Sequence, residues 1–427
     1  MSNAEFAGAG ISDGAFSDQA FLQDFATMSS HGATAAGGVD REACTPADQE
    51  NRQWMSTVFE RATGNPAQFD AIANQFSTIE FIPGAPYVLL GSHLDSQPMA
   101  GRFDGAYGVL AGAYAAARVR AAVEAGEITP KFNLAVVNWF NEEGSRFAPS
   151  MMGSSVAINK MGLDEALEST DFYGTTVREA FDKTGYPGTA SLPKIASYAE
   201  IHNEQGKNLE QAGAQIGLVT ATWGARKFRV VVRGEQGHTG STLMEDRHDA
   251  LFGASIVIAQ ARRIVDKFPG QPLQISVSQM EVKPNSPVTI AREVIFNVDI
   301  RCPHAEILEQ AEQHLETVIA EAADEARVKI ERTLTHSWNQ NDYSPAGCEL
   351  AREVAENLGY SHREVMTVAG HDSTNMKDEV PTVMLFVPSV DGISHNEAEL
   401  TLDDDCLAGL DVFTGVVRCL VAGALHE

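Results

Sequence analysis

Two long apolar segments, each followed directly by acidic residues, stand out in the hydrophobic pattern of the chain. Residues 86–90 (PYVLL) and 132–140 (FNLAVVNWF) are almost continuously apolar, which is typical of strands buried on both faces of a parallel sheet. The first leads into GSHLDSQPMAGRFDG (91–105) and the second into NEEGSRF (141–147). Because the carboxyl ends of parallel strands meet at one edge of an open sheet, we expect their polar side chains to converge in a metal site. The candidates are His93, Asp95, Asp104, Glu142 and Glu143.

The pattern changes between about residues 219 and 333. Strand signals at 226–234, 273–282, 292–301 and 327–335 alternate with helix signals at 249–268 and 304–324. The second helix has apolar residues at three-and-four spacing, as an amphipathic helix does. The order β-α-β-β-α-β is that of a split βαβ unit. We therefore predict a ferredoxin-like α+β domain over 219–333, inserted into a larger domain formed by residues 1–218 and 334–427.

The flanking segments predict an α/β domain with a mostly parallel mixed sheet between helices. Helices are expected at 108–126, near 348–358 and near 403–424, and a strand at 380–388. A chain of 427 residues also exceeds what one hydrophobic core usually supports. The N-terminal GAGISDG (8–14) resembles a phosphate loop, but no strand precedes it, so we expect a mobile terminus.

Composition excludes several classes of partner. The chain has 31 Lys and Arg against 58 Asp and Glu, a formal net charge of −27, which leaves little material for a nucleic-acid-binding face. Most of this acidic excess is expected on a solvated surface, since a cation site accounts for only a few charges. No apolar segment is long enough to span a bilayer, and no secretory signal pattern opens the chain. Five scattered cysteines without C-x-x-C spacing favour a reducing, cytoplasmic location.

Six motifs, in this order and spacing, resemble co-catalytic metal amidohydrolases of the aminoacylase/carboxypeptidase superfamily. They are the two segments above and EIHNEQG (200–206), GEQGHTGS (234–241), AGHDS (369–373) and GISHNEAE (392–399). The chain is most similar to the hydantoinase/carbamoylase-type branch, which contains N-carbamoyl-L-amino-acid amidohydrolases, allantoate amidohydrolases and β-ureidopropionases. GGVDREACTPAD (37–48) also resembles the N-terminal segment of that branch. The resemblance therefore covers nearly the whole chain.

The resemblance implies two divalent metal ions in each subunit. His93 would bind one ion, Glu143 the other, and Asp104 would bridge both. His202 and His395 would complete the set, one on each ion. A bridging carboxylate holds two cations about 3.5–4 Å apart, where they can acidify a shared water. Mixed histidine and carboxylate ligands suit Zn²⁺ or Mn²⁺, with Co²⁺ and Ni²⁺ as alternatives.

Glu142 is the expected general base. Two adjacent acids usually form a solvated surface turn, but this pair follows a buried strand, which favours one acid on a metal and the other on the water. Asp95 is positioned to hold the imidazole of His93. For His371 in AGHDS, three roles are open: direct contact in the site, support of the site, and packing at a helix start. Seven other histidines have no ligand-like surroundings, and we expect them to be structural or exposed: His31, His248, His304, His314, His336, His362 and His426.

The inserted domain is expected to contribute substrate contacts. His238 resembles the lid histidine that, in this family, reaches the partner subunit's site and polarises the scissile carbonyl, which implies a homodimer. Asn285 and Arg301 resemble the pair that holds the substrate's amide and carboxylate, although Arg301 also suits a surface salt bridge. Gln205 is the expected polar contact of a carbamoyl group.

Three motifs depart from the common family pattern near the substrate. HNEQG replaces H-I-E-Q-G, NSPVTIARE replaces an Asn-Val-Val-Pro-Gly segment, and SHNEAE replaces SHNPAE. No expected ligand is lost. We therefore expect hydrolysis of a linear C–N amide bond, the ureido group of an N-carbamoyl-L-amino acid, with release of CO₂ and ammonia. The alternatives are allantoate or another ureido acid, an N-acyl-amino acid or dipeptide, and a metal-binding scaffold without turnover.

Overall fold

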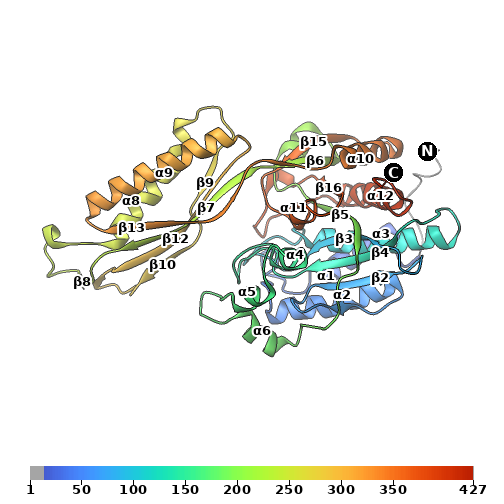
Figure 1. The fold of residues 1–427 in the computed structure, drawn as a ribbon, viewed down its shortest axis with the longest axis horizontal. Coiled ribbons are helices and arrows are strands. Elements are labelled where there is room, and N and C mark those ends of the chain that lie inside the picture. Colours follow the sequence, from blue (N-terminus) through green and yellow to red (C-terminus); the bar gives the residue numbers. More distant parts are fainter. Residues whose placement is uncertain (1–13, 427) are drawn as a thin grey trace. The chain divides into compact units, whose positions relative to one another are not determined.

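The computed structural model describes residues 14–426, and the chain divides into two compact units (Figure 1). Unit 1 comprises Met1–Thr220 and Tyr343–Glu427, and unit 2 comprises Ala221–Asp342. The chain enters unit 2 close to the expected residue 218. It leaves later than the expected 333, because the last long strand of unit 2, β13 (Lys329–Trp338), continues beyond that point. Residues 8–13 of the GAGISDG segment lie outside the described residues.

A nine-stranded mixed sheet forms the centre of unit 1. Its strands follow the order β1-β2-β4-β3-β5-β16-β6-β14, with β15 beside β6. The central neighbours β4, β3, β5 and β16 are parallel, whereas the flanking pairs β1–β2, β2–β4, β16–β6 and β6–β14 are antiparallel. The expected α/β class is confirmed. The strand bounds are β1 Gln68–Phe69, β2 Gln75–Ile79, β3 Tyr87–His93, β4 Asn133–Trp139, β5 Ile195–Asn203, β6 Ile216–Thr222, β14 Asn341–Asp342, β15 His362–Thr367 and β16 Thr382–Val387.

Helices cover both faces of this sheet. Alternate residues of β3 point to opposite faces, so Val88 and Leu90 join the core beneath α1, α2, α3, α10 and α12, whereas Leu89 joins a cluster with Met376 of α11. Helix α3 packs so closely on β5 that a Cβ at Gly108 would collide with the Ile201 carbonyl. The bounds are α1 Asp18–Met28, α2 Pro46–Thr63, α3 Ala106–Glu124, α4 Met152–Ala157, α5 Leu163–Glu168, α6 Val177–Thr184, α7 Asn208–Ala212, α10 Pro345–Leu358, α11 Asp372–Met376, α12 Asp403–Val421 and the 3₁₀ turn η3 Val390–Gly392.

Unit 2 is an antiparallel sheet with two helices on one face (Figure 1). The sheet order β10-β12-β7-β13, with β9 also beside β12, arises from long elements in the expected sequence β-α-β-β-α-β. The bounds are β7 Gly224–Arg233, β8 Gly237–His238, η1 Met244–Asp246, α8 Ala250–Arg263, η2 Ile264–Lys267, β9 Gln274–Ser276, β10 Met280–Lys283, β11 Thr289–Ile290, β12 Glu293–Cys302, α9 Ala305–Ala326 and β13 Lys329–Trp338.

The strand expected at 273–282 is divided in two. Ser276 of β9 pairs with Asp299, and Met280 of β10 pairs with Phe296, so three residues on one side lie opposite two on β12. An extra residue of this kind forms a β-bulge, which interrupts the ladder.

Within residues 14–426, no helix combines the length and apolar character that crossing a membrane requires.

Candidate metal centre

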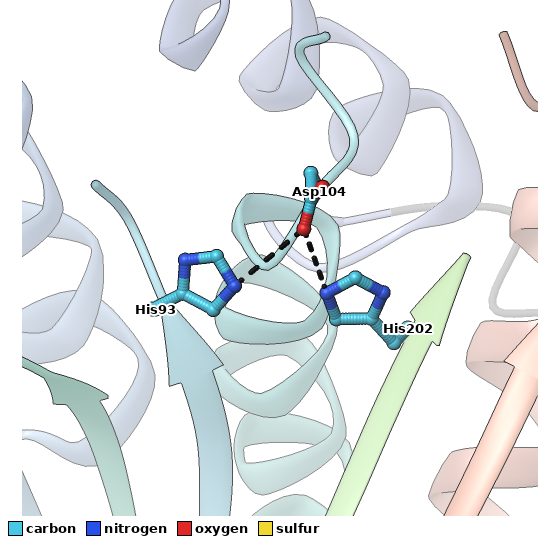
Figure 2. A group of neighbouring side chains, drawn as sticks. All are labelled: His93, Asp104 and His202. Atoms are coloured by element: carbon cyan, nitrogen blue, oxygen red, sulfur yellow. Dashed lines mark ion pairs between the residues drawn. The ribbon is translucent and has the colours of Figure 1, made fainter. Parts of the chain in front are cut away.

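The carboxyl ends of β3 and β5 bring two histidines to one aspartate (Figure 2). His93 ends β3, His202 lies near the end of β5, and Asp104 comes just before α3. The Nε2 atoms of His93 and His202 lie 3.6 Å and 3.1 Å from the same Asp104 oxygen, Oδ1. All three residues are buried. They form the first donor group.

A second donor group shares Asp104 through its other oxygen. His395 Nε2 lies 3.2 Å from Asp104 Oδ2 and 3.5 Å from Glu143 Oε2. In each group the candidate ligand atoms lie within 4.8 Å of one another. The His395 side chain is 48% exposed, so the second group borders solvent. The structure thus brings together the five expected ligands, with one Asp104 oxygen facing each group.

The histidine tautomers fit a cation between the donors. Nδ1 of His93 lies 2.9 Å from the Asp95 carbonyl oxygen, and Nδ1 of His202 lies 2.9 Å from the Asn203 carbonyl oxygen. A carbonyl only accepts, so each Nδ1 carries a proton and each Nε2 turns toward a carboxylate oxygen of Asp104. The negative charge of Asp104 favours a cation between these atoms, and the backbone N–H of Gly105 also approaches His202 Nε2, at 2.8 Å. Ligand atoms about 2.1 Å from a tetrahedral ion lie roughly 3.4 Å apart, which agrees with the observed nitrogen–oxygen separations.

The buried carboxylates also carry more negative charge than their surroundings favour. Burial, together with the charge of Asp104, raises the pKa of Glu143 to about 8. Burial and the nearby Asp372 raise the pKa of Glu142 well above its usual range. Burial lowers the pKa of His93 to about 4, whereas the hydrogen bond to Asp104 overcomes burial and raises the pKa of His202 to about 9. Bound cations would favour the ionised carboxylates.

The adjacent acids of NEE point to different donor groups. Glu142 Oε2 lies 3.6 Å from His93 Nε2, whereas Glu143 Oε2 faces His395. Asp95 fixes this loop, because its two carboxylate oxygens accept the backbone N–H groups of Glu142 and Glu143, each at 3.2 Å. We expected the Asp95 carboxylate to hold the His93 imidazole, but that carboxylate is 3.8 Å away, and the Asp95 carbonyl makes the closer contact.

The region of the chain that carries these residues matches a known protein family. Residues 89–418, which include all five candidate ligands, match the model of peptidase family M20/M25/M40. The chain belongs to this family. An amidase of the hydantoinase/carbamoylase family from Burkholderia vietnamiensis has a similar fold, with a TM-score of 0.89 and 33% identity over 96% of this chain and 98% of the other.

Sequence relatives of this M20 protein are also hydrolases. A Mycolicibacterium smegmatis protein, named as a hydrolase without a substrate, is 51% identical over 96% of this chain and 94% of its own length. An N-carbamoyl-L-amino-acid amidohydrolase of Rhizobium meliloti is 34% identical, covering 90% of this chain and 92% of its own. An allantoate amidohydrolase of Bacillus subtilis is 31% identical, covering 88% and 90%. The resemblance seen in the motifs is confirmed, and the M20 protein is an amidohydrolase.

Two polar residues that support the M20 site lie within recognised motifs, but no role was predicted for them from the sequence. Glu200 is buried two residues before His202 on β5 and accepts hydrogen bonds from Ser92 Oγ at 2.7 Å and from the backbone N–H of Ser373 at 2.8 Å. Gln97 donates to Glu143 Oε2 at 2.8 Å. The two-residue spacing from His202 was the available clue to Glu200.

His371 and Gln205 occupy clear positions in unit 1. His371 is the N-cap of α11, and its ring packs against that of His202, with centroids 4.5 Å apart. It belongs to neither donor group, and its contacts fit support of His202 as well as packing at a helix start. Gln205 Nε2 donates to Asp104 Oδ2 at 2.7 Å. Within the described residues, neither donor group includes another histidine.

The expected substrate residues His238, Asn285 and Arg301 lie in unit 2. His238 Nδ1 accepts hydrogen bonds from the backbone N–H groups of Gly240 and Ser241, at 3.0 Å and 3.2 Å, so its Nε2 carries the proton. Asn285 is exposed and has a positive φ of 58°. The Arg301 guanidinium pairs with Asp299, with Nη2 at 2.7 Å, which is the alternative contact considered for it. Their contact with a substrate stays a prediction.

Proposed function

We propose that this M20 amidohydrolase cleaves the ureido C–N bond of an N-carbamoyl-L-amino acid and releases the amino acid, CO₂ and ammonia. The observation that carries the proposal is the pair of buried donor groups joined at Asp104, in a chain with a full-length relative named for this reaction. We also place the protein in the cytoplasm, because its five cysteines are all free.

The proposed cofactors are two divalent ions, Zn²⁺ or Mn²⁺, with Co²⁺ or Ni²⁺ as alternatives. His93 and His202 would hold the first, Glu143 and His395 the second, and Asp104 both. Ions at these positions supply Lewis-acid polarisation of the carbamoyl oxygen and lower the pKa of a water. The donor separations and the surplus of buried negative charge support this assignment.

Glu142 is the proposed general base and acid. It takes a proton from the attacking water and delivers it to the leaving nitrogen as the C–N bond breaks. Its position beside His93 and the loop geometry fixed by Asp95 support this role. Proton transfer by a carboxylate positioned in this way contributes about 10²–10⁴-fold to the rate.

Polar groups of the chain are proposed to orient the substrate. Gln205 Oε1 is buried without a hydrogen-bond donor among the described residues, so it can accept from the carbamoyl NH₂. His238 offers its Nε2–H to the carbonyl oxygen as negative charge develops there. Arg301 and Asn285 would bind the substrate carboxylate and amide, with the carboxylate replacing Asp299 on the guanidinium.

The proposal requires residues of both units to contact one substrate molecule. Since the lid histidine in this family acts on the partner's site, we propose a homodimer in which unit 2 completes the site of the partner subunit.

Allantoate is the second candidate substrate, because a relative of similar identity is named for it. The test is a panel of N-carbamoyl-L-amino acids, N-carbamoyl-β-alanine, allantoate and N-acetyl-amino acids, assayed for ammonia and free amino acid with metal-refilled protein. Equal amounts of ammonia and amino acid from an N-carbamoyl-L-amino acid support the proposal. Ammonia from allantoate alone favours the second candidate. Amino acid without ammonia indicates an acylase or peptidase, and a silent panel indicates a scaffold; both results reject the proposal.

A further inference from the structure

A buried glutamate near the C-terminus lies directly behind the shared aspartate. Glu399 is 4% exposed, and its Oε1 accepts the backbone N–H groups of Phe103 at 2.9 Å and Asp104 at 3.1 Å. Two successive N–H groups on one oxygen fix the backbone from which the Asp104 side chain projects. Glu399 therefore holds the backbone at Asp104 directly, although the two residues lie far apart in the sequence.

The second oxygen of Glu399 is connected to the Asp104 side chain through a serine. Ser394 Oγ donates to Glu399 Oε2 at 2.7 Å, and the same hydroxyl lies 3.1 Å from Asp104 Oδ2. Ser394 also accepts from Gln205 Nε2 at 3.1 Å. Because Ser394 directly precedes His395, this one carboxylate connects the loop of the shared aspartate to the loop of the second donor group.

The loop of Asp104 leaves space for this carboxylate. A side chain at Gly101 would collide with Glu399, whose Cβ would lie only 2.5 Å from the new methyl group. Glu399 accepts hydrogen bonds from two N–H groups and one hydroxyl, and no lysine or arginine within residues 14–426 forms an ion pair with it. Burial of a carboxylate without a cationic partner is unfavourable unless charge nearby compensates.

We propose that Glu399 is a positioning residue for the metal centre: it sets the orientation of Asp104 between the two donor groups and holds the His395 loop in register with it. This inference rests on the proposed metal site and adds to it a residue outside the ligand set. Partners that orient metal ligands contribute about 10–100-fold to metal affinity. Glu399 supports the second donor group in two ways, through Asp104 and through Ser394, which precedes His395. It supports the first donor group only through Asp104.

The experiment measures metal affinity without substrate. Metal-stripped full-length protein is titrated with Zn²⁺ in competition with a chromophoric chelator, and bound ions are counted by mass spectrometry. For Glu399→Ala we expect the ion of the second donor group to lose about 10–100-fold in affinity. Glu399→Gln keeps one acceptor oxygen for the N–H groups, so a smaller loss is expected. Ser394→Ala cuts the same network without removing a buried carboxylate, and it provides the test if Glu399→Ala does not fold.

Asp411→Asn is the matched control. Asp411 is also a buried carboxylate of unit 1, hydrogen-bonded to Arg118 at 3.1 Å and Tyr360 at 2.8 Å, but it belongs to neither donor group. This variant is expected to lower Tm while it leaves both Zn²⁺ affinities unchanged. Wild-type Zn²⁺ affinities in Glu399→Ala and Ser394→Ala, or an equal loss in Asp411→Asn, would overturn the inference. The substrate panel decides the proposed function separately, because a protein that binds two ions but hydrolyses no ureido acid still answers this question.

Discussion

Gly105→Ala tests whether the geometry around His93 controls the metal centre. Gly105 lies at the start of α3 with φ of 63°, and a methyl group built there would lie 2.2 Å from His93 Nε2, against 3.4 Å for the start of ordinary contact. The imidazole must therefore move by roughly 1 Å, which carries Nε2 out of bonding range of an ion about 2.1 Å away. A misplacement of this size costs about 10²-fold in rate, equivalent to about 2.7 kcal/mol.

The backbone at Gly105 adds a separate cost to stability. A side chain at this positive φ costs about 1–3 kcal/mol, which lowers Tm by several degrees in a domain of this size. Gly126→Ala is the control, because Gly126 has φ of 76° and nothing within 4 Å of a built Cβ. It introduces similar backbone strain without the collision.

The assay combines ions per chain, Tm and the rate of ammonia release for both variants. We expect both to lose stability, whereas only Gly105→Ala loses an ion and at least about 10²-fold in kcat/KM. A Gly105→Ala protein that keeps two ions and a rate close to wild type would refute the placement of His93 in the metal centre.

Three further results are expected. Glu142→Gln keeps its metal but loses about 10²–10⁴-fold in kcat, measured by ion count and ammonia release; an active variant would reject the base assignment. Arg301→Ala raises KM for carboxylate substrates by about 10²-fold with a smaller change in kcat. The control, Arg332→Ala, removes another ion pair of unit 2 (Arg332–Glu312, 2.9 Å) and leaves KM unchanged. Equal KM values in the two variants would show that Arg301 does not bind the substrate carboxylate. Zn²⁺ at about 100 times its Kd adds about 2.7 kcal/mol to the stability of the metal-stripped protein, so Tm rises by roughly 3–5 °C, and an unchanged Tm would contradict binding to the folded site.

The positions of the ligand candidates were predictable from the sequence because they depend on strand ends. Apolar runs located β3 and β4, and the rule that parallel strands end at one edge placed His93, Glu142 and Glu143 together. Resemblance in the motifs added His202 and His395, which no local pattern connects to β3. The structure then showed how the two oxygens of Asp104 divide between the groups.

Details that depend on three-dimensional pairing were not predictable. The β9–β10 bulge results from one extra residue opposite β12, and the hydrophobic pattern through 273–282 does not reveal it. The Asp95 carboxylate binds backbone N–H groups whose positions are known only after the NEE loop folds. Glu399 was part of a recognised motif, but its partners Phe103 and Asp104 lie almost 300 residues earlier.

Metal reconstitution of the wild-type protein tests the proposed chemistry most directly. Metal-stripped protein receives increasing equivalents of Zn²⁺ or Mn²⁺, and ammonia and free amino acid are measured with an N-carbamoyl-L-amino acid that the panel identifies as a substrate. The binuclear site predicts equimolar products whose rate rises until two ions are bound to each chain. Full activity in the stripped protein, or no hydrolysis with two ions bound, would contradict it.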